Sequence, residues 1–344
     1  MSLSLGFTLI LFAAVCGGAF AVPLKRRRKF ALENIYVLAS LLTMVVIPLL
    51  VASFSLPDWP AAIRNAGGGT VTRGLAYGFA WGVGAVTFGY GVSLAGLSIG
   101  YATIMGINTA VGSLLPFLVK SPRDLFTPGG LVILTGIFGC IGGVAICGRA
   151  GSLRESSDRA NASTDGQPKA HFLLALLICL ISGVLSACAN LGFAFTSRIA
   201  EEAQKLGATP VIATLGSWLP VYWGGFAANL IWFGAAQIRN GSWRYNFAPG
   251  AGHDWWMSVL MGTLWFLAMI PYGMGAYYLG RLGTSVGWAI SIASSLLVAN
   301  IFGFITGEWK GAPRTAILLL SVGLGLLVAA MAVLGLGNSM LMAY

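Results

Sequence analysis

The placement of charge constrains this chain most: all thirty charged residues lie outside ten apolar stretches of the 344-residue sequence. Each stretch is long enough for a helix to cross a bilayer core of about 30 Å. The ten predicted spans are 3–24, 34–54, 74–95, 98–119, 130–148, 172–197, 210–237, 255–279, 284–306 and 315–337. Because the backbone must satisfy its own hydrogen bonds in lipid, the sequence predicts an all-α membrane protein with ten transmembrane helices.

Composition and charge agree with this class. The chain is 57% hydrophobic and 9% charged, whereas soluble domains carry about 25% charged residues. The net charge of +10 therefore predicts no nucleic-acid partner, and membrane lipid is the expected surrounding. With the N-terminus outside, inner segments hold thirteen Lys and Arg residues and outer segments hold seven. The positive-inside rule thus predicts that both termini lie outside the cytoplasm.

Cysteine and histidine give no sign of a cofactor or an enzyme. All five cysteines fall within predicted spans, and His171 and His253 lie at the ends of spans, far apart in sequence. This pattern predicts neither a disulfide framework nor a metal site. An intramembrane enzyme would need a nucleophile with a base, or a metal pair, at membrane depth. We expect a protein that is not an enzyme, with no metal and no cofactor.

An internal repeat divides the chain. The longest polar interval, 149–171, separates five spans from five, and it predicts an N-terminal repeat over 1–148, a cytoplasmic linker over 149–171 and a C-terminal repeat over 172–344. Ser98-Ile99-Gly100-Tyr101-Ala102 recurs as Ser285-Val286-Gly287-Trp288-Ala289, 187 residues later. An odd number of helices makes the second copy enter the membrane from the opposite side. Two inverted five-helix repeats, with a site near the midplane, are typical of alternating-access carriers.

Polar residues inside the spans indicate where a substrate would bind. Helical spacing puts Ser98, Tyr101 and Asn108 on one face of the fourth span, and the repeat copies this face as Ser285, Trp288 and Ser295. Ser182, Ser186 and Asn190 form a stripe on the sixth span. These stripes predict one central cavity. The alternative is that each Ser bonds a carbonyl of its own helix and each Asn joins two helices.

Aromatic residues lie in the same spans. Trp81, Tyr272 and Trp288 sit deeper than the tryptophans at span ends, which belong to interfacial belts. Aromatic faces flanked by Asn and Ser suit a sugar, whose C–H faces stack while its hydroxyls form hydrogen bonds. An organic cation would need a carboxylate nearby, and none lies in mid-span. The predicted substrate-binding residues are Trp81, Ser98, Tyr101, Asn108, Ser186, Asn190, Tyr272, Ser285, Trp288 and Ser295.

Several motifs, in this order and spacing, carry a resemblance to a known family. They are Pro23-Leu24-Lys25 through Glu33, Trp81-Gly82-Val83-Gly84 with Tyr90-Gly91, Asn190 leading to Leu206-Gly207-Ala208-Thr209-Pro210, Gly224-Gly225 with Asn229-Leu230, and Glu308-Trp309. Through nearly its whole length the chain resembles the bacterial L-rhamnose/proton symporter family of the drug/metabolite transporter superfamily. The resemblance implies ten helices, termini outside, and uptake of a deoxyhexose with a proton across the bacterial inner membrane.

The coupling group and two alternatives stay open. A proton symporter needs a titratable group, and every carboxylate here lies at or beyond a span end. Glu308 is the first choice because it follows a polar-lined span, with Glu33 and Asp254 as further inner candidates. The alternatives are an uncoupled or sodium-coupled carrier and a metabolite exporter of the drug/metabolite transporter type. A carrier of phosphorylated substrates would need basic residues within its spans, and the spans hold none.

Overall fold

In the computed structural model, residues 2–20, 22–95, 97–160, 169–305, 307 and 309–342 are described, and they contain helices without a strand. Nine helices in these residues are long and apolar enough to cross a membrane. The chain is thus an all-α, multi-pass membrane protein. The count of ten spans stays a prediction.

The long helices coincide closely with the predicted spans. They are α1 (Leu3–Ala19) with α2 (Val22–Lys25), α3 (Leu32–Leu41) with η1 (Leu42–Val46) and α4 (Ile47–Ser55), α6 (Gly68–Ala95), α7 (Leu97–Lys120), α8 (Pro128–Ala160), α9 (Lys169–Phe195), α13 (Gly252–Tyr278), α14 (Gly283–Ile305) and α15 (Arg314–Met342). The short elements are α5 (Trp59–Ala66), η2 (Pro122–Phe126), α10 (Ser197–Lys205), η4 (Ser242–Phe247) and η5 (Gly280–Leu282).

The seventh predicted span, 210–237, is helical but is not among those nine. It consists of α11 (Pro210–Asn229), η3 (Leu230–Gly234) and α12 (Ala235–Asn240). Most of α11 is buried, including Trp218 and Tyr222. A helix enclosed by other helices can carry Trp, Tyr, Ser and Gly where a lipid-facing helix carries Leu and Ile. The lower hydropathy of this segment therefore follows from its place in the interior.

Local signals explain several helix boundaries. Asp58 caps α5 by accepting a hydrogen bond from the backbone N–H of Ala61 at 3.2 Å. Pro210 stands at the first position of α11, where a missing N–H costs nothing. Gly241, with φ of 64°, ends α12 in the left-handed region. The predicted linker 149–171 is partly helical, because α8 continues to Ala160, and residues 161–168 lie outside the described part.

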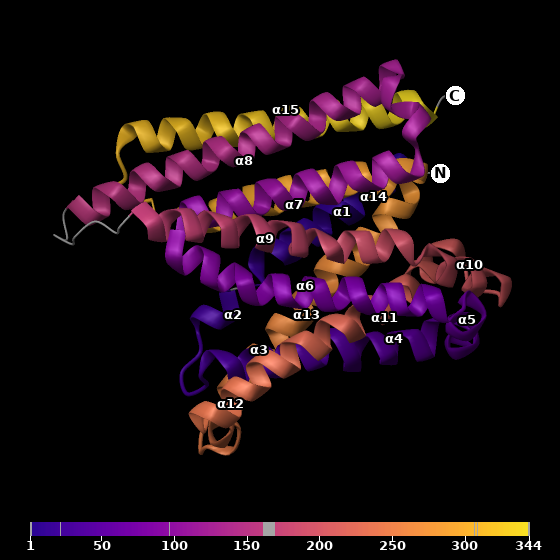
Figure 1. Cartoon of the computed structure of the whole chain (residues 1–344), viewed down its shortest axis with the longest axis horizontal. Coiled ribbons are helices and arrows are strands. Elements are labelled where there is room, and N and C mark those ends of the chain that lie inside the picture. Colours follow the sequence, from indigo (N-terminus) through magenta and orange to yellow (C-terminus); the bar gives the residue numbers. More distant parts are fainter. Residues whose placement is uncertain are drawn as a thin grey trace. The chain divides into compact units, whose positions relative to one another are not determined.

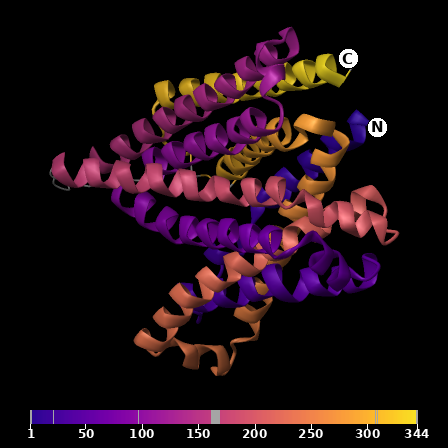
Figure 2. The same cartoon turned by 45° about the vertical axis from the view of Figure 1, so that its right-hand side comes forward.

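Contacts group the chain into two units, and we describe each by itself. Unit 1 comprises residues 84–187 and 279–344, and unit 2 comprises residues 2–83 and 188–278. In unit 1, α8 and α15 run side by side (Figures 1 and 2), and α7 packs on both α8 and α14. In unit 2, α13 packs on α1 and α3, and α11 packs on α10 and α13.

Two features agree with the predicted repeat. The fourth and ninth predicted spans, α7 and α14, pack on each other, as do the fifth and tenth, α8 and α15. One π-helical turn interrupts the second helix of each predicted half. It is η1 (Leu42–Val46) in the first half and η3 (Leu230–Gly234) in the second. Their starts lie 188 residues apart (230 minus 42), close to the offset of 187 seen in sequence. The repeat boundaries and the inverted topology stay predictions.

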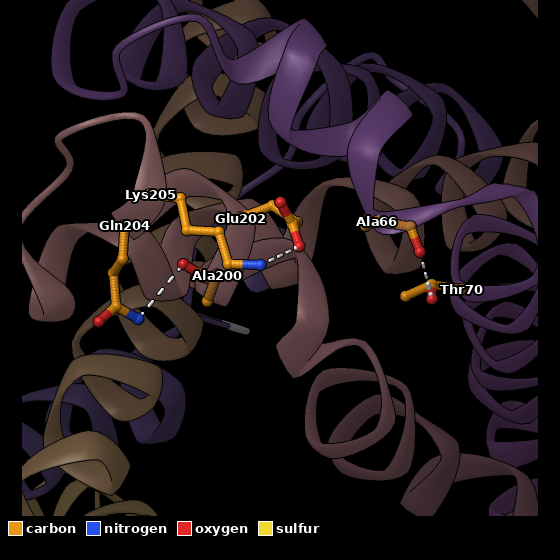
Figure 3. Close-up of polar contacts among 6 residues, drawn as sticks. All are labelled: Ala66, Thr70, Ala200, Glu202, Gln204 and Lys205. Carbon is orange, nitrogen blue, oxygen red and sulfur yellow. Dashed lines mark hydrogen bonds and ion pairs between the residues drawn. The ribbon is translucent and has the colours of Figure 1, made fainter.

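One end of unit 2 carries the short helices α5 and α10, which pack on each other. Thr70 Oγ1 donates to the carbonyl of Ala66 at 2.9 Å where α5 gives way to α6 (Figure 3). Within α10, Gln204 Nε2 donates to the Ala200 carbonyl at 3.3 Å, and Lys205 pairs with Glu202 at 2.7 Å. These polar contacts are local ones, each spanning three or four residues.

Candidate functional site: two buried polar pairs and an aromatic cluster

A buried hydrogen bond joins two predicted site residues in unit 2. The Tyr272 hydroxyl on α13 donates to Asn190 Oδ1 on α9 at 2.5 Å, and both side chains are fully buried. The two residues come from helices 82 positions apart in sequence, so this contact is a tertiary one. An amide and a phenol together offer donors and acceptors in the apolar interior, as recognition of a polyhydroxylated ligand requires.

Aromatic rings surround this pair in unit 2. We call six residues the aromatic cluster: Trp81, Phe193, Trp218, Tyr222, Trp265 and Tyr272. Trp81 stacks on Trp265 with ring centroids 6.2 Å apart, and Phe193 stacks on Trp218 at 4.7 Å. Tyr222 links these two stacks through Trp218 and Trp81. The cluster thus presents several ring faces within one helical unit.

Glycines let these rings and helices approach one another. A Cβ atom at Gly225 would lie 3.1 Å from the ring of Trp81, and one at Gly273 would lie 2.7 Å from Trp218 Nε1. Gly78 and Gly82 of α6 lie directly against the backbone of α11. Close packing of helices is the common role of small residues in membrane proteins. In unit 2 this packing also fixes the positions of the tryptophans.

Among the residues of unit 2 that the structure describes, three buried side-chain atoms have no hydrogen-bond partner. They are Trp218 Nε1, Tyr222 Oη and Asn229 Oδ1, and all three belong to α11. Leaving a buried donor or acceptor unsatisfied costs about 1–3 kcal/mol. Such groups are uncommon in folded proteins, and each asks for an explanation.

Unit 1 contains the second polar pair. Trp288 Nε1 on α14 donates to Asn108 Oδ1 on α7 at 3.2 Å, and both residues are at least 95% buried. The indole ring packs directly on Gly112, one turn beyond Asn108, where any side chain would collide with it. Ser285, one turn before Trp288, is buried and its hydroxyl lacks a partner. The face predicted on α14 is therefore turned into the unit.

The remaining predicted residues fall into three groups. Tyr101 of unit 1 packs edge to face on Phe88, with ring centroids 5.9 Å apart. Ser186 and Ser295 are half-buried in α9 and α14. The side chain of Ser98 and the whole of Glu308 lie outside the described residues. In unit 2 the structure brings Asn190 and Tyr272 together, and it places Trp81 against Trp265 and Tyr222. In unit 1 it brings Asn108 and Trp288 together. One cavity lined by both sets stays a prediction.

Helix-joining contacts, the alternative for isolated polar residues, account for part of the predicted stripe on α9. Ser182 Oγ donates to the carbonyl of Gly84 on α6 at 3.1 Å, so its hydroxyl joins two helices. Further along, Thr196 Oγ1 donates to the carbonyl of Ser217 at 2.9 Å, and Ser217 Oγ donates back to the carbonyl of Thr196 at 3.3 Å. Ser182 thus joins helices in unit 1, and Thr196 and Ser217 join helices in unit 2.

Sequence reasoning left four members of the aromatic cluster out of the site. They are Phe193, Trp218, Tyr222 and Trp265. Trp218 and Tyr222 stand four residues apart, which puts them on one face of a helix. That spacing was the available signal, and Asn229 extends the same face. Phe193 and Trp265 carry no comparable signal, because single aromatics in apolar helices are common.

At the predicted cytoplasmic end of unit 2, two carboxylates accept hydrogen bonds from segments distant in sequence. Asp254 is fully buried and accepts hydrogen bonds from three consecutive backbone N–H groups, those of Arg28, Lys29 and Phe30, at 2.8, 2.7 and 3.1 Å. Glu33 Oε1 accepts from Ser242 Oγ at 2.7 Å and from Asn240 Nδ2 at 3.0 Å. Asp254 therefore connects α13 to the segment before α3, and Glu33 connects the start of α3 to the segment around Ser242. In each case the two segments are more than 200 residues apart in sequence.

The residues that the structure describes hold no group of three or more His, Cys, Asp or Glu side chains that could bind a metal. The five cysteines are all buried. The two polar pairs and the aromatic cluster consist of neutral hydrogen-bonding groups and aromatic faces. Such groups bind and orient a neutral polar ligand.

Known proteins resemble the chain over almost all of its length. A sequence model described as L-rhamnose-proton symport protein (RhaT) matches residues 1–340. Proteins named L-rhamnose-proton symporter are 26% identical in Cronobacter sakazakii, 25% in Salmonella paratyphi A and 24% in Escherichia coli O1:K1 / APEC. Each alignment covers 98% of this chain and 98% of the relative. A crystal structure of another protein, 15% identical, shares the fold with a TM-score of 0.57, covering 97% of this chain and 98% of that one.

Proposed function

Since this chain belongs to the L-rhamnose-proton symport protein family, we propose that it imports L-rhamnose or a related monosaccharide together with a proton. The observation that carries the proposal is the match over residues 1–340, joined by relatives that align from end to end. A bacterial inner membrane with both chain termini outside the cytoplasm is the setting that this function and the positive-inside rule favour.

The two polar pairs support a sugar as the substrate. Asn190 with Tyr272, and Asn108 with Trp288, supply neutral donors and acceptors in apolar surroundings. Sugar hydroxyls exchange hydrogen bonds with such groups, and the C–H face of the sugar ring stacks on Trp81 or its neighbours. Alternating access then requires that the carrier bind the sugar from either side without breaking a bond. No nucleophile or cofactor has a role in this scheme.

Proton coupling through Glu308 is the second part of the proposal. A coupling carboxylate must gain and lose its proton during the cycle. Asp254 is held by three backbone donors, and Glu33 by two side-chain donors, so both already have structural partners. Glu308 lies outside the described residues, so its choice as the coupling carboxylate rests on the sequence alone. Glu308→Gln should leave sugar binding intact and abolish accumulation against a gradient.

The test is to add L-rhamnose to lightly buffered, de-energised cells that express the chain and to record external pH. Alkalinisation specific to L-rhamnose is the expected result, because each sugar would carry a proton inward. Cells with an empty vector and a panel of other sugars serve as controls. Alkalinisation with another sugar would change the substrate and keep the mechanism. Uptake of labelled sugar without alkalinisation would instead favour the uncoupled or sodium-coupled carrier.

A further inference from the structure

The unpartnered polar atoms of unit 2 share one face of one helix. Trp218, Tyr222 and Asn229 stand at relative positions 0, 4 and 11 on α11. At 3.6 residues per turn, these positions fall within about 40° of arc. The rings of Trp218 and Tyr222 stack with centroids 5.5 Å apart, and both side chains are fully buried. The face thus presents an N–H donor, a hydroxyl and an amide carbonyl in a row.

Other buried polar groups near this face have partners. The Tyr272 hydroxyl bonds Asn190, and Thr196 and Ser217 bond each other's carbonyls. Among the described residues of unit 2, the buried side-chain atoms without a hydrogen-bond partner are the three on this face. Random imperfection would scatter such atoms over several helices. Their concentration on α11 indicates that a partner joins this face in another state of the protein.

The surroundings of the face define the chemistry of that partner. Phe193 and Tyr272 pack around Trp218, and Trp81 packs beside Tyr222. Gly273 adds no side chain in front of the Trp218 indole N–H. A ligand that suits this environment carries hydroxyl groups on one edge and C–H groups on its faces, and it bears no charge. A monosaccharide has this character.

We propose that Trp218 Nε1 and Tyr222 Oη form a hydrogen-bonding row for the hydroxyl groups of the transported sugar. Trp218 and Tyr222 stand on successive turns of α11, whereas Asn229 is about 10 Å farther along the helix axis, beyond the reach of the same sugar ring. This inference rests on the proposed function and adds residues that determine sugar affinity. In the structure the rings of Phe193, Tyr272 and Trp81 pack around Trp218 and Tyr222. Sugar therefore reaches them when the rings of α9 and α13 separate from α11, and the row is left without partners when the empty cluster closes.

The experiment uses Trp218→Phe and Tyr222→Phe in the full-length protein purified in detergent. Tyr222→Phe keeps the ring and removes the hydroxyl, whereas Trp218→Phe removes the indole N–H and puts a smaller phenyl ring in place of the indole. We would measure the melting temperature without sugar and the Kd for L-rhamnose and a panel of monosaccharides by calorimetry. Without sugar, the melting temperature of Tyr222→Phe should stay the same or rise, because an unsatisfied group has been removed, whereas Trp218→Phe should lower it because the smaller ring leaves a cavity. Sugar affinity should fall about three- to tenfold in each variant.

Two further variants serve as controls. Tyr272→Phe removes a hydroxyl that has a partner in the empty protein, so it should lower the melting temperature without sugar. Trp243→Phe alters an indole on the exposed η4 turn, away from the aromatic cluster, and both measurements should stay unchanged. The opposite signs expected for Tyr222→Phe and Tyr272→Phe separate a hydroxyl that lacks a partner in the empty protein from one that has a partner there.

The outcomes that overturn the inference are distinct from those that overturn the proposed function. Unchanged Kd values in both variants, with normal binding by the wild type, would refute the row and leave the carrier proposal intact. A lower melting temperature of Tyr222→Phe would show that its hydroxyl has a partner in the empty protein, and would also refute the row. If the wild type bound no sugar of the panel, both proposals would fall. If Trp218→Phe did not fold, Tyr222→Phe alone would decide.

Discussion

Unit 1 and unit 2 are both made of long apolar helices that approach closely at glycines, but unit 2 adds a cluster of stacked aromatic rings between its helices. In unit 1, α8 and α15 meet through small residues: Gly136 faces Leu334, Gly139 faces Ala330 and Gly143 faces Leu327. In unit 2, Gly78 and Gly82 also bring α6 against α11, and large aromatic rings and hydrogen bonds between segments distant in sequence join the helices as well. Small-residue contacts suit a fixed scaffold, whereas rings held by a few polar contacts suit a region that must open for a ligand.

The largest expected effect comes from breaking the small-residue packing of unit 1. At Gly323 on α15, a Cβ atom would lie 3.0 Å from the backbone nitrogen of Cys147 and 3.1 Å from the carbonyl oxygen of Gly143. Gly323→Leu should therefore abolish folded protein, since backbone atoms cannot yield as a side chain can. Gly325→Leu is the matched control on the same helix, because nothing lies within 4 Å of its Cβ position. Size-exclusion profiles in detergent check both variants, and normal folding of Gly323→Leu would contradict the scaffold interpretation.

The second effect tests how far unit 2 depends on its hydrogen bonds. Asp254→Ala leaves the backbone N–H groups of Arg28, Lys29 and Phe30 without their acceptor. An unsatisfied buried group costs about 1–3 kcal/mol, so the loss should be about 3 kcal/mol or more. Thermal unfolding of the purified variant measures this loss. A melting temperature equal to that of the wild type would mean that water or other groups replace the carboxylate.

The third effect asks whether both units take part in binding. Asn190→Ala and Asn108→Ala should each weaken sugar uptake at least about tenfold, or about 1.4 kcal/mol, because each removes hydrogen-bonding groups in a buried setting. Kinetics of labelled uptake at matched membrane levels provide the measurement. Asn300→Ala is the control, because Asn300 bonds the carbonyl of Leu296 in its own helix. A loss confined to Asn190→Ala would restrict the site to unit 2.

The smallest effect is expected at the surface of unit 2. Lys205→Gln removes the ion pair with Glu202, in which the lysine side chain is 69% exposed (Figure 3). Exposed ion pairs contribute at most about 1 kcal/mol. The melting temperature and the uptake rate should both stay close to wild type. A marked loss of uptake would instead show that α10 takes part in transport.

The sequence was sufficient for the class of fold and for most helix boundaries. Apolar length and charge placement are conditions that the bilayer imposes on every span, so they can be read without tertiary information. The seventh span shows where this reasoning ends. Its interior position allows polar and aromatic residues, so its apolar signal is weak although it is helical throughout.

The candidate site was predicted only in part. Asn190, Asn108 and Trp288 were predicted from face periodicity, and Tyr272 from its depth in an apolar span. Their pairing, however, depends on how distant helices pack. The same periodicity could not tell Asn190, which meets a tyrosine, from Ser182, which joins a neighbouring helix. Trp218 and Tyr222 have a visible spacing, yet their missing partners can be recognised only from coordinates.

The paired π-helical turns η1 and η3 carry a consequence for the ancestry of the chain. A π-turn holds one more residue than the α-turn it replaces, and it shifts every later side chain by about 100° around the helix axis. Both predicted halves carry this extra residue in their second helix. If one gene segment was duplicated to form the halves, the insertion is older than the duplication, and the single ancestral copy already had the bulge. Deleting one residue from η1 or η3 would thus reverse the older of the two events.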